Sequence, residues 1–184
     1  MIAKPLARAG VSPDAITYVS LFFAFLASLS LILTHFQLLF GILVFIAGLL
    51  DGVDGTVARL TGSSSASGGF TDSVIDKVAE MLILAGIAVA YQNDLILGFS
   101  VPIWIIFALF GWLMTSYARA RAQSLNVTDL DVGLGGRSER LLTLVVFSIF
   151  NALLWGIIVV TIIGLGTAAY RFYHYRLQMS KERS

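Results

Sequence analysis

Four aspartates in two close pairs are the residues of this chain best suited to chemistry. Asp51 and Asp54 are three residues apart, and Asp72 and Asp76 are four apart. On a helix, both spacings place the two carboxylates of a pair on one face. If the helices that carry the pairs are antiparallel neighbours joined by the Gly/Ser-rich turn at residues 60–69, the four side chains converge. Hard divalent cations such as Mg²⁺ and Mn²⁺ bind such oxygen ligands, and Mg²⁺ is commonly shared with substrate phosphates.

Glycines beside both pairs predict that helices or a nucleotide approach the backbone closely. They are Gly52, Gly55, Gly68 and Gly69. The alternative for any single aspartate is a solvated carboxylate at the end of a helix. Four of them at this spacing favour a metal site.

The composition is that of a membrane protein, which makes the aspartates costly. Of the 184 residues 58% are hydrophobic and 12% charged, and the mean hydropathy is +0.88. Residues 15–50, 95–118 and 141–170 contain no Asp, Glu, Lys or Arg. A helix needs roughly 20 apolar residues to cross the bilayer. A carboxylate inside it costs at least about 2.5 kcal/mol, so several persist only when paired, hydrated or bound to a cation.

The elements that must position the aspartates are predicted to be helices. We expect an all-α integral membrane protein, a single domain over residues 1–184, with a short basic lead-in at residues 1–10 lying along the bilayer surface. The turns at residues 35–37 and 151–152 divide two of the charge-free stretches. This gives six transmembrane helices, at residues 14–34, 37–60, 69–91, 97–122, 136–151 and 153–176. With no cysteine in the chain, a thiolate metal site is excluded.

The basic residues predict the orientation. In the six-helix arrangement all twelve Lys and Arg residues fall on one side, whereas the opposite turns carry His35, Asp94 and Asn151. Basic residues favour the cytoplasmic side, so both termini are expected there. We therefore expect a multi-pass protein of the cell (plasma) membrane. Its polar cavity would face the cytoplasm and open sideways to lipid.

The aspartates belong to a longer motif that carries a resemblance. Asp51, Asp54, Gly55, Ala58, Arg59, Gly68, Asp72 and Asp76 match the pattern D-x2-D-G-x2-A-R-x8-G-x3-D-x3-D. At every fixed position the chain resembles the CDP-alcohol phosphatidyltransferases, and the segments SPDAIT, SYARARAQ and GGRSERL extend the similarity. The resemblance implies a membrane enzyme, commonly a homodimer, that transfers a phosphatidyl-type group from a CDP-linked lipid to an alcohol and releases CMP. No nucleic-acid partner is expected.

The resemblance also implies roles for individual residues. The four aspartates would bind Mg²⁺ or Mn²⁺, as two ions, and Asp76 would also be the base that takes the proton of the acceptor hydroxyl. Two such ions can stabilise both the attacking and the leaving oxygen of an in-line displacement. The residues expected to contact the CDP-lipid are Asp14, Thr17, Gly55, Ala58, Arg59, Ser65 and Gly68. For Thr17 alone, a purely structural role at the start of a helix is the alternative.

Four further arginines suggest an acceptor that itself carries a phosphate. They are Arg119, Arg121, Arg137 and Arg140, and arginine binds phosphate through paired hydrogen bonds. The alternative is salt bridges with Glu80, Glu139, Asp129 and Asp131. The segments that hold these arginines are similar to those of phosphatidylinositol-phosphate and archaetidylinositol-phosphate synthases, which implies inositol 1-phosphate. Gly136 and Gln123 replace usual acids of those enzymes, so glycerol 3-phosphate stays open, as does the diacyl or ether nature of the lipid.

Two residues and two other classes of protein stay open. Glu80 is a candidate to brace an arginine of a neighbouring helix, and Lys77 a candidate to extend toward the interface. Buried acids also mark ion pathways, so a divalent-cation transporter is the main alternative to an enzyme, followed by a non-catalytic scaffold. The outer halves of the six expected helices are almost wholly apolar, which argues against a transport path.

Overall fold

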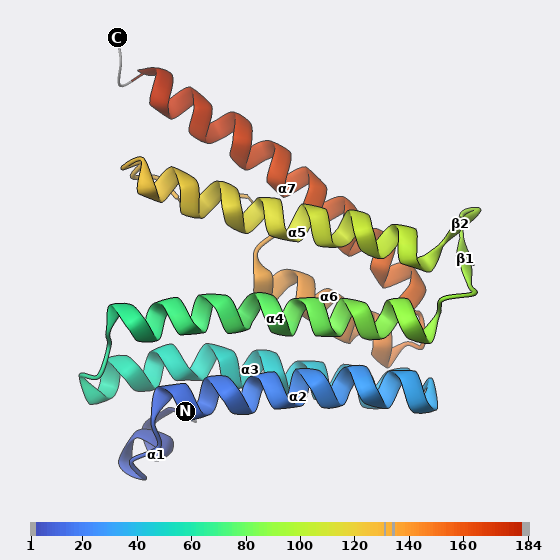
Figure 1. Ribbon diagram of the computed structural model, residues 1–184, viewed down its shortest axis with the longest axis horizontal. Coiled ribbons are helices and arrows are strands. Elements are labelled where there is room, and N and C mark those ends of the chain that lie inside the picture. Colours follow the sequence, from blue (N-terminus) through green and yellow to red (C-terminus); the bar gives the residue numbers. More distant parts are fainter. Residues whose placement is uncertain (1–2, 131, 134, 182–184) are drawn as a thin grey trace. The chain divides into compact units, whose positions relative to one another are not determined.

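The computed structural model describes residues 3–130, 132–133 and 135–181, which are mainly helical (Figure 1). Asp131 and Arg183 lie outside these residues. In chain order the elements are α1 (Ala3–Arg8), α2 (Pro13–Thr34), α3 (Gln37–Thr61), α4 (Ala66–Ala90), β1 (Leu95–Ile96), β2 (Phe99–Ser100), α5 (Val101–Ser124), α6 (Arg137–Ile149) and α7 (Leu153–Lys181).

The predicted turns between helices are confirmed. His35 ends α2 in the left-handed conformation, with φ of 52°, and Asn151 between α6 and α7 has φ of 53°. Both conformations are tolerated by few residue types other than glycine and asparagine, and they reverse the chain within a few residues. The expected pairs of helices on either side of these turns are therefore present.

Two predicted boundaries are wrong. Residues 97–100 do not begin a helix, because Leu95–Ile96 and Phe99–Ser100 form a two-stranded antiparallel hairpin before α5. Its turn residues Leu97 and Gly98 both have positive φ, which is typical of a two-residue hairpin turn. The Gly/Ser-rich turn is also shorter than expected, since α4 already begins at Ala66.

The chain folds into two compact units, which divide between Ala90 and Tyr91. In the first unit α2 packs against both α3 and α4, and α1 packs against α3. Small polar residues hold these contacts: the Ser20 hydroxyl donates to the Ala47 carbonyl at 2.8 Å, and the Ser28 hydroxyl donates to the Leu82 carbonyl at 2.6 Å. A Cβ on Gly86 would lie 2.7 Å from the Ser28 backbone, so only glycine allows this approach of α4 to α2.

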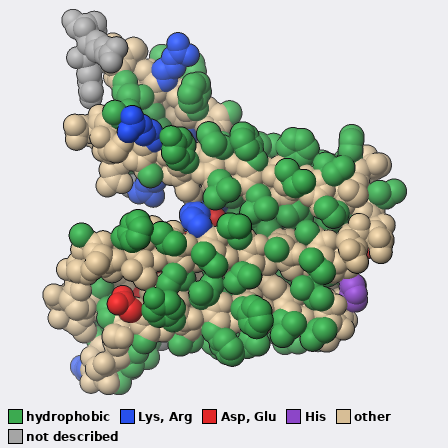
Figure 2. All heavy atoms as spheres, in the orientation of Figure 1, with side chains coloured by type: hydrophobic (Ala, Val, Ile, Leu, Met, Phe, Trp, Pro, Cys, Tyr) green, Lys and Arg blue, Asp and Glu red, His purple; other side chains and the backbone are tan. Residues whose placement is uncertain are grey.

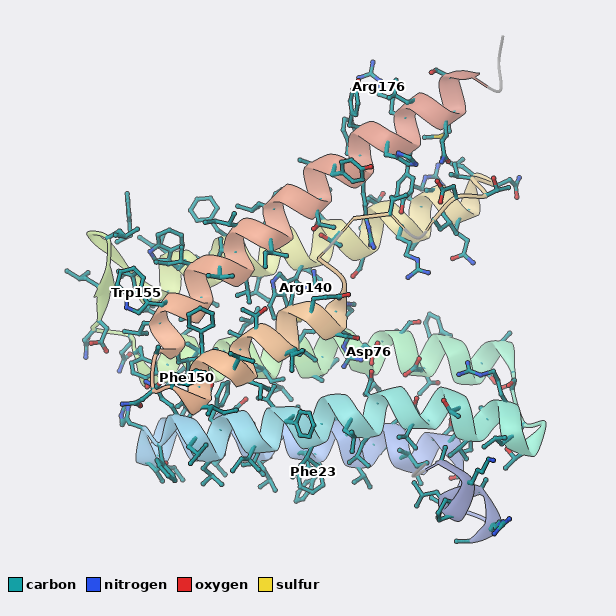
Figure 3. The ribbon with its side chains drawn as sticks, turned by 180° about the vertical axis from the view of Figure 1, so that it is seen from behind. Phe23, Asp76, Arg140, Phe150, Trp155 and Arg176 are labelled. Atoms are coloured by element: carbon teal, nitrogen blue, oxygen red, sulfur yellow. The ribbon has the colours of Figure 1, made fainter. Side chains whose placement is uncertain are left out.

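In the second unit α5 and α7 lie side by side, and α6 packs against α7 (Figure 1). Glycines again set the closest approach, because a Cβ on Gly111 would lie 2.7 Å from the Leu165 backbone nitrogen. The Thr115 hydroxyl beside it donates to the Gly164 carbonyl at 3.1 Å. In Figure 3, Arg140 lies near the N-terminal end of α6 and Phe150 at its C-terminal end.

Among the described residues, four helices are long and apolar enough to cross a membrane, namely α2, α3, α5 and the part of α7 from Leu153 to Ser180. Hydrophobic side chains dominate over charged ones on the face shown in Figure 2. The chain is thus a multi-pass membrane protein. Helix α4 has 25 residues but carries the charges of Asp72, Asp76, Lys77 and Glu80.

Helix α6 differs most from its prediction as a spanning helix. It has 13 residues and begins at Arg137, with Gly136 as its N-cap, rather than before that arginine. At 1.5 Å per residue it is about 20 Å long, which is less than the roughly 30 Å of hydrocarbon in a bilayer.

Candidate active site

Three of the four motif aspartates converge. Asp51 from α3 and Asp72 and Asp76 from α4 are half-buried and each offers a carboxylate oxygen, with these oxygens all within 4.8 Å of one another. Figure 3 shows Asp76 on α4. Three carboxylates this close repel one another unless a cation or protons offset their charge. Carboxylate oxygens of this kind suit Mg²⁺ or Mn²⁺, which also take water and phosphate oxygens as ligands.

Asp54 has a different local environment. It is 3% exposed, and its Oδ2 accepts a hydrogen bond from the Thr17 hydroxyl at 2.6 Å. Its Oδ1 accepts from the backbone N–H of Gly55. Asp54 is therefore outside the three-carboxylate group and links α3 to the first turns of α2. Thr17 is buried with it, so its hydroxyl does more than complete the start of a helix.

A cavity of about 380 Å³ lies between the starts of α2 and α4 and the end of α3. All seven residues predicted to contact the CDP-lipid line it, together with Asp54 and Asp72. Its volume is within the range of small-molecule sites. The lining residues that sequence reasoning missed are Ser12, Pro13, Ser63 and Ser64, whereas Gly69 was singled out only for close approach.

Two helix N-termini and one arginine make the cavity suitable for phosphate. At the start of α4 the Ser65 hydroxyl accepts from the Gly68 N–H at 3.0 Å, and at the start of α2 the Ser12 hydroxyl accepts from the Ala15 N–H at 3.3 Å. Free N–H groups and the helix dipole favour anions at such ends. Arg59 on the same cavity donates to the Thr56 hydroxyl at 3.2 Å.

The glycines of the motif leave this space open. A Cβ on Gly68 would lie 3.1 Å from the Ser65 hydroxyl, and a Cβ on Gly55 would lie 3.7 Å from an Arg59 guanidinium nitrogen. Larger side chains at either position would fill the cavity or displace the arginine. The capping serines give the signal that sequence reasoning could have used, since a serine just before a helix is a common cap.

Lys77, which directly follows Asp76, forms an ion pair with Glu80 on the same helix. The Lys77 ammonium lies 2.8 Å from Glu80 Oε2, and the Glu80 side chain is 3% exposed. The structure thus gives Glu80 a partner on its own helix. The bracing of an arginine on a neighbouring helix by Glu80 stays a prediction.

The four arginines predicted for the acceptor phosphate are all in the second unit and differ in burial. Arg119 and Arg121 are exposed in the last turns of α5, and Arg121 donates to the Ser124 hydroxyl at 3.2 Å. Arg137 is half-buried at the first position of α6. Arg140 is 1% exposed, and its guanidinium carbon lies 4.6 Å from the centre of the Trp112 ring.

The loop before α6 is held by side chains of α7. His174 and Gln178 each lie 3.3 Å from Asp129 Oδ2, so this acid has partners other than the four arginines. The Tyr175 hydroxyl donates to the Leu130 carbonyl at 2.8 Å, and Arg171 donates to the Val132 carbonyl at 2.9 Å.

The chain combines membrane-spanning helices with a carboxylate cluster suited to divalent cations and a cavity with anion-binding helix ends. These features are typical of a membrane protein that acts on phosphate groups with the help of metal ions. Residues 10–171 match the CDP-alcohol phosphatidyltransferase family. The chain belongs to this family, which confirms the resemblance carried by the aspartate motif, and it is a membrane phosphatidyltransferase.

Named relatives match most of the chain. An archaetidylinositol phosphate synthase from Pyrococcus horikoshii is 35% identical over 97% of this chain and 90% of its own length. A phosphatidylinositol phosphate synthase from Cutibacterium acnes is 34% identical over 77% of this chain and 67% of its own length.

A crystal structure shares the fold. Mycobacterium tuberculosis phosphatidylinositol phosphate synthase, in complex with manganese and citrate, gives a TM-score of 0.80 at 22% identity, covering 95% of this chain and 87% of that chain. Another structure of the same protein has CDP-DAG bound.

Proposed function

We propose that this enzyme transfers a phosphatidyl-type group, diacyl or archaeal ether, from a CDP-linked lipid to inositol 1-phosphate and releases CMP. The observation that carries the proposal is the carboxylate cluster beside a cavity lined by two helix N-termini and Arg59. Relatives named as inositol phosphate synthases, in the archaeal and the bacterial lipid class alike, support the acceptor.

The diphosphate of the CDP-lipid binds where the starts of α2 and α4 meet the cavity. Their N–H groups and Arg59 offset its negative charge, and Gly55 and Ala58 leave room for the cytidine. Asp14 at the start of α2 lies on the same cavity, where it borders the nucleotide. Transfer forms a bond from the acceptor oxygen to the lipid-linked phosphorus and breaks the bond from that phosphorus to CMP. Asp76 accepts the proton of the acceptor hydroxyl.

Asp51, Asp72 and Asp76 are the residues that would hold Mg²⁺ or Mn²⁺, and the donor set fits two ions shared with the substrate diphosphate. Asp54 lines the cavity beside them and completes the ligand set proposed from the motif. When bound, such ions supply charge neutralisation and orientation for in-line displacement.

The acceptor phosphate binds to arginines of the second unit. Arg137 and Arg140 lie in the first turn of α6, whose N-terminus also favours an anion, and Arg119 and Arg121 end α5. Glycerol 3-phosphate is the second candidate, because Gly136 and Gln123 depart from the inositol phosphate enzymes.

An acceptor panel tests the proposal. Purified enzyme with CDP-lipid and Mg²⁺ is offered inositol 1-phosphate, glycerol 3-phosphate, free inositol or serine, and CMP release is measured. We expect the fastest release with inositol 1-phosphate and a large rise in its KM in Arg137→Ala and Arg140→Ala. Preference for free inositol or serine would contradict a phosphate pocket. Absence of CMP release with every acceptor would contradict the proposed reaction.

We also propose that six helices cross the plasma membrane, with both termini and the cavity on the cytoplasmic side, and that the enzyme is a homodimer. The loop at Gly135 lies against Thr167 of α7, and α7 continues for about another 20 Å, at 1.5 Å per residue, to Lys181. The start of α6 therefore lies about 20 Å from the C-terminal end of α7, measured along that helix.

The absence of native cysteine makes the topology directly testable. Single cysteines at His35, Asp94 and Ser65 can be labelled with a membrane-impermeant thiol reagent in oriented vesicles. We expect labelling from outside for the first two and from the cytoplasmic side for Ser65→Cys. Cross-linking of tagged and untagged copies in the membrane tests the homodimer.

A further inference from the structure

The buried guanidinium of Arg140 lies over an aromatic ring. Its central carbon is 4.6 Å from the centre of the Trp112 ring, and the two residues are each 1% exposed. Arg140 comes from the first turn of α6 and Trp112 from the middle of α5. The face of an indole attracts a cation, and this attraction is stronger when both groups are removed from water.

The Trp112 ring is itself fixed by the crossing of α5 and α7. Its indole N–H donates to the Val160 carbonyl at 3.4 Å. A Cβ on Gly164 would lie 2.8 Å from Trp112 Cδ1, so the glycine provides the space that the ring fills. These contacts with the α7 backbone hold the ring in place. The orientation of the ring face toward Arg140 therefore depends on backbone atoms rather than on a flexible side chain.

The contact with Trp112 involves the plane of the Arg140 guanidinium rather than its N–H edge. A guanidinium that stacks on an aromatic face keeps its N–H groups in the plane, where a phosphate binds them in pairs. Arg137, three residues earlier, is half-buried at the helix N-terminus. An arginine held against a ring, one helical turn from a more exposed arginine, is an arrangement that can orient a tetrahedral anion.

We propose that Trp112 is a positioning residue for the acceptor: its ring holds the Arg140 guanidinium in the orientation that binds the acceptor's phosphate. This inference rests on the proposed function of Arg140. It adds that selectivity for a phosphorylated acceptor depends on the π face of a residue that touches neither substrate.

Fluorinated tryptophan tests the inference without changing the packing. Fluorine atoms withdraw charge from the ring face and weaken its attraction for a cation, while the shape of the side chain is almost unchanged. Trp104 and Trp155 are first replaced by phenylalanine, so that Trp112 is the only tryptophan in the chain. The enzyme is then made with tryptophan carrying increasing numbers of fluorine atoms, and KM and kcat are measured for inositol 1-phosphate and for the CDP-lipid.

We expect the KM for inositol 1-phosphate to rise stepwise with fluorination, by about tenfold across the series, equivalent to about 1.4 kcal/mol. The KM for the CDP-lipid is expected to stay constant, as is the thermal unfolding temperature. Trp112→Phe, which keeps a smaller ring, is expected to raise the KM for inositol 1-phosphate about as much as an intermediate degree of fluorination does. Trp112→Leu is expected to raise the KM for inositol 1-phosphate more than the most fluorinated tryptophan does.

Arg140→Ala separates the possible failures. If Arg140→Ala raises the acceptor KM but the fluorinated series is flat, Trp112 only packs and the inference is wrong while the proposed function stands. If Arg140→Ala leaves the acceptor KM unchanged, the arginine is not in the acceptor site and both proposals for it fail. Equal changes in the KM of both substrates would show a general structural effect and also overturn the inference.

Discussion

The hydrogen bond between Thr17 and Asp54 offers a test of how the first unit is organised. It joins α2 to α3, measures 2.6 Å, and its two side chains are 4% and 3% exposed. Replacing Thr17 with valine keeps the shape of the side chain but removes the hydroxyl that donates to Asp54 Oδ2. The carboxylate would then be buried with one hydrogen bond fewer.

The expected effect is on binding of the metal and of the CDP-lipid. A hydrogen bond to a charged group contributes about 1.5 to 3 kcal/mol. If that loss moves Asp54 away from the cavity it lines, the KM for the CDP-lipid and the Mg²⁺ concentration at half-maximal rate rise by about 10- to 100-fold in total. The KM for the phosphorylated acceptor should change little, because its arginines belong to the second unit.

The assay is CMP release as a function of Mg²⁺ and CDP-lipid concentration. Thr17→Ser keeps the hydroxyl and should remain within a few-fold of the wild type. Thr34→Val at the other end of α2, whose hydroxyl donates to the Ser30 carbonyl, is the matched control. A double-mutant cycle with Asp54→Asn should be non-additive, since both changes break the same contact. Unchanged Mg²⁺ and CDP-lipid dependence in Thr17→Val would refute the positioning of Asp54 by Thr17.

Other changes test the rest of the site and the packing. Asp76→Asn should abolish turnover while CDP-lipid binding is largely kept, whereas Asp51→Asn should also weaken metal binding; near-normal CMP release by Asp76→Asn at saturating Mg²⁺ would exclude it as the base. EDTA should stop the reaction and added Mg²⁺ or Mn²⁺ should restore it, and activity that persists in EDTA would rule out a metal requirement. Gly164→Ala should lower the thermal unfolding temperature because its Cβ meets Trp112, while Gly166→Ala, with nothing within 4 Å, should not; equal effects would contradict the tight crossing.

The residues around the cavity were predictable because they belong to a single local motif. From Asp51 to Asp76 the chain forms the end of one helix, a short turn and the start of the next, so residue spacing determines which side chains meet. Spacing on one helix and a reversal at the glycines suffice to bring Asp51 toward Asp72 and Asp76. The lining of the cavity by Asp14 and Thr17 needed the motif resemblance, since α2 is distant in sequence.

The local partner of each polar side chain was not predictable. Asp51 and Asp54 have the same motif context, yet Asp54 binds Thr17 and the Gly55 backbone, because it faces the first turns of α2. Glu80 pairs with Lys77 on its own helix, where the i to i+3 spacing also allows an ion pair. Helical periodicity identifies a face of a helix, but it does not say which neighbouring helix lies against that face.

The same limit applies to the loop before α6, whose partners are side chains in the second half of the long helix α7. Thr167, Arg171 and Tyr175 are four residues apart and form one stripe on α7. Arg171 donates through Nε to the Val132 carbonyl at 2.9 Å and through Nη1 to the Thr115 carbonyl at 2.9 Å, so one buried side chain joins the loop to α5. Gly135 packs against Thr167 with no room for a Cβ. The stripe thus provides donors for two carbonyl groups of the loop, those of Leu130 and Val132. The start of α6, and with it Arg137 and Arg140, is thereby fixed by a helix that carries none of the proposed acceptor residues.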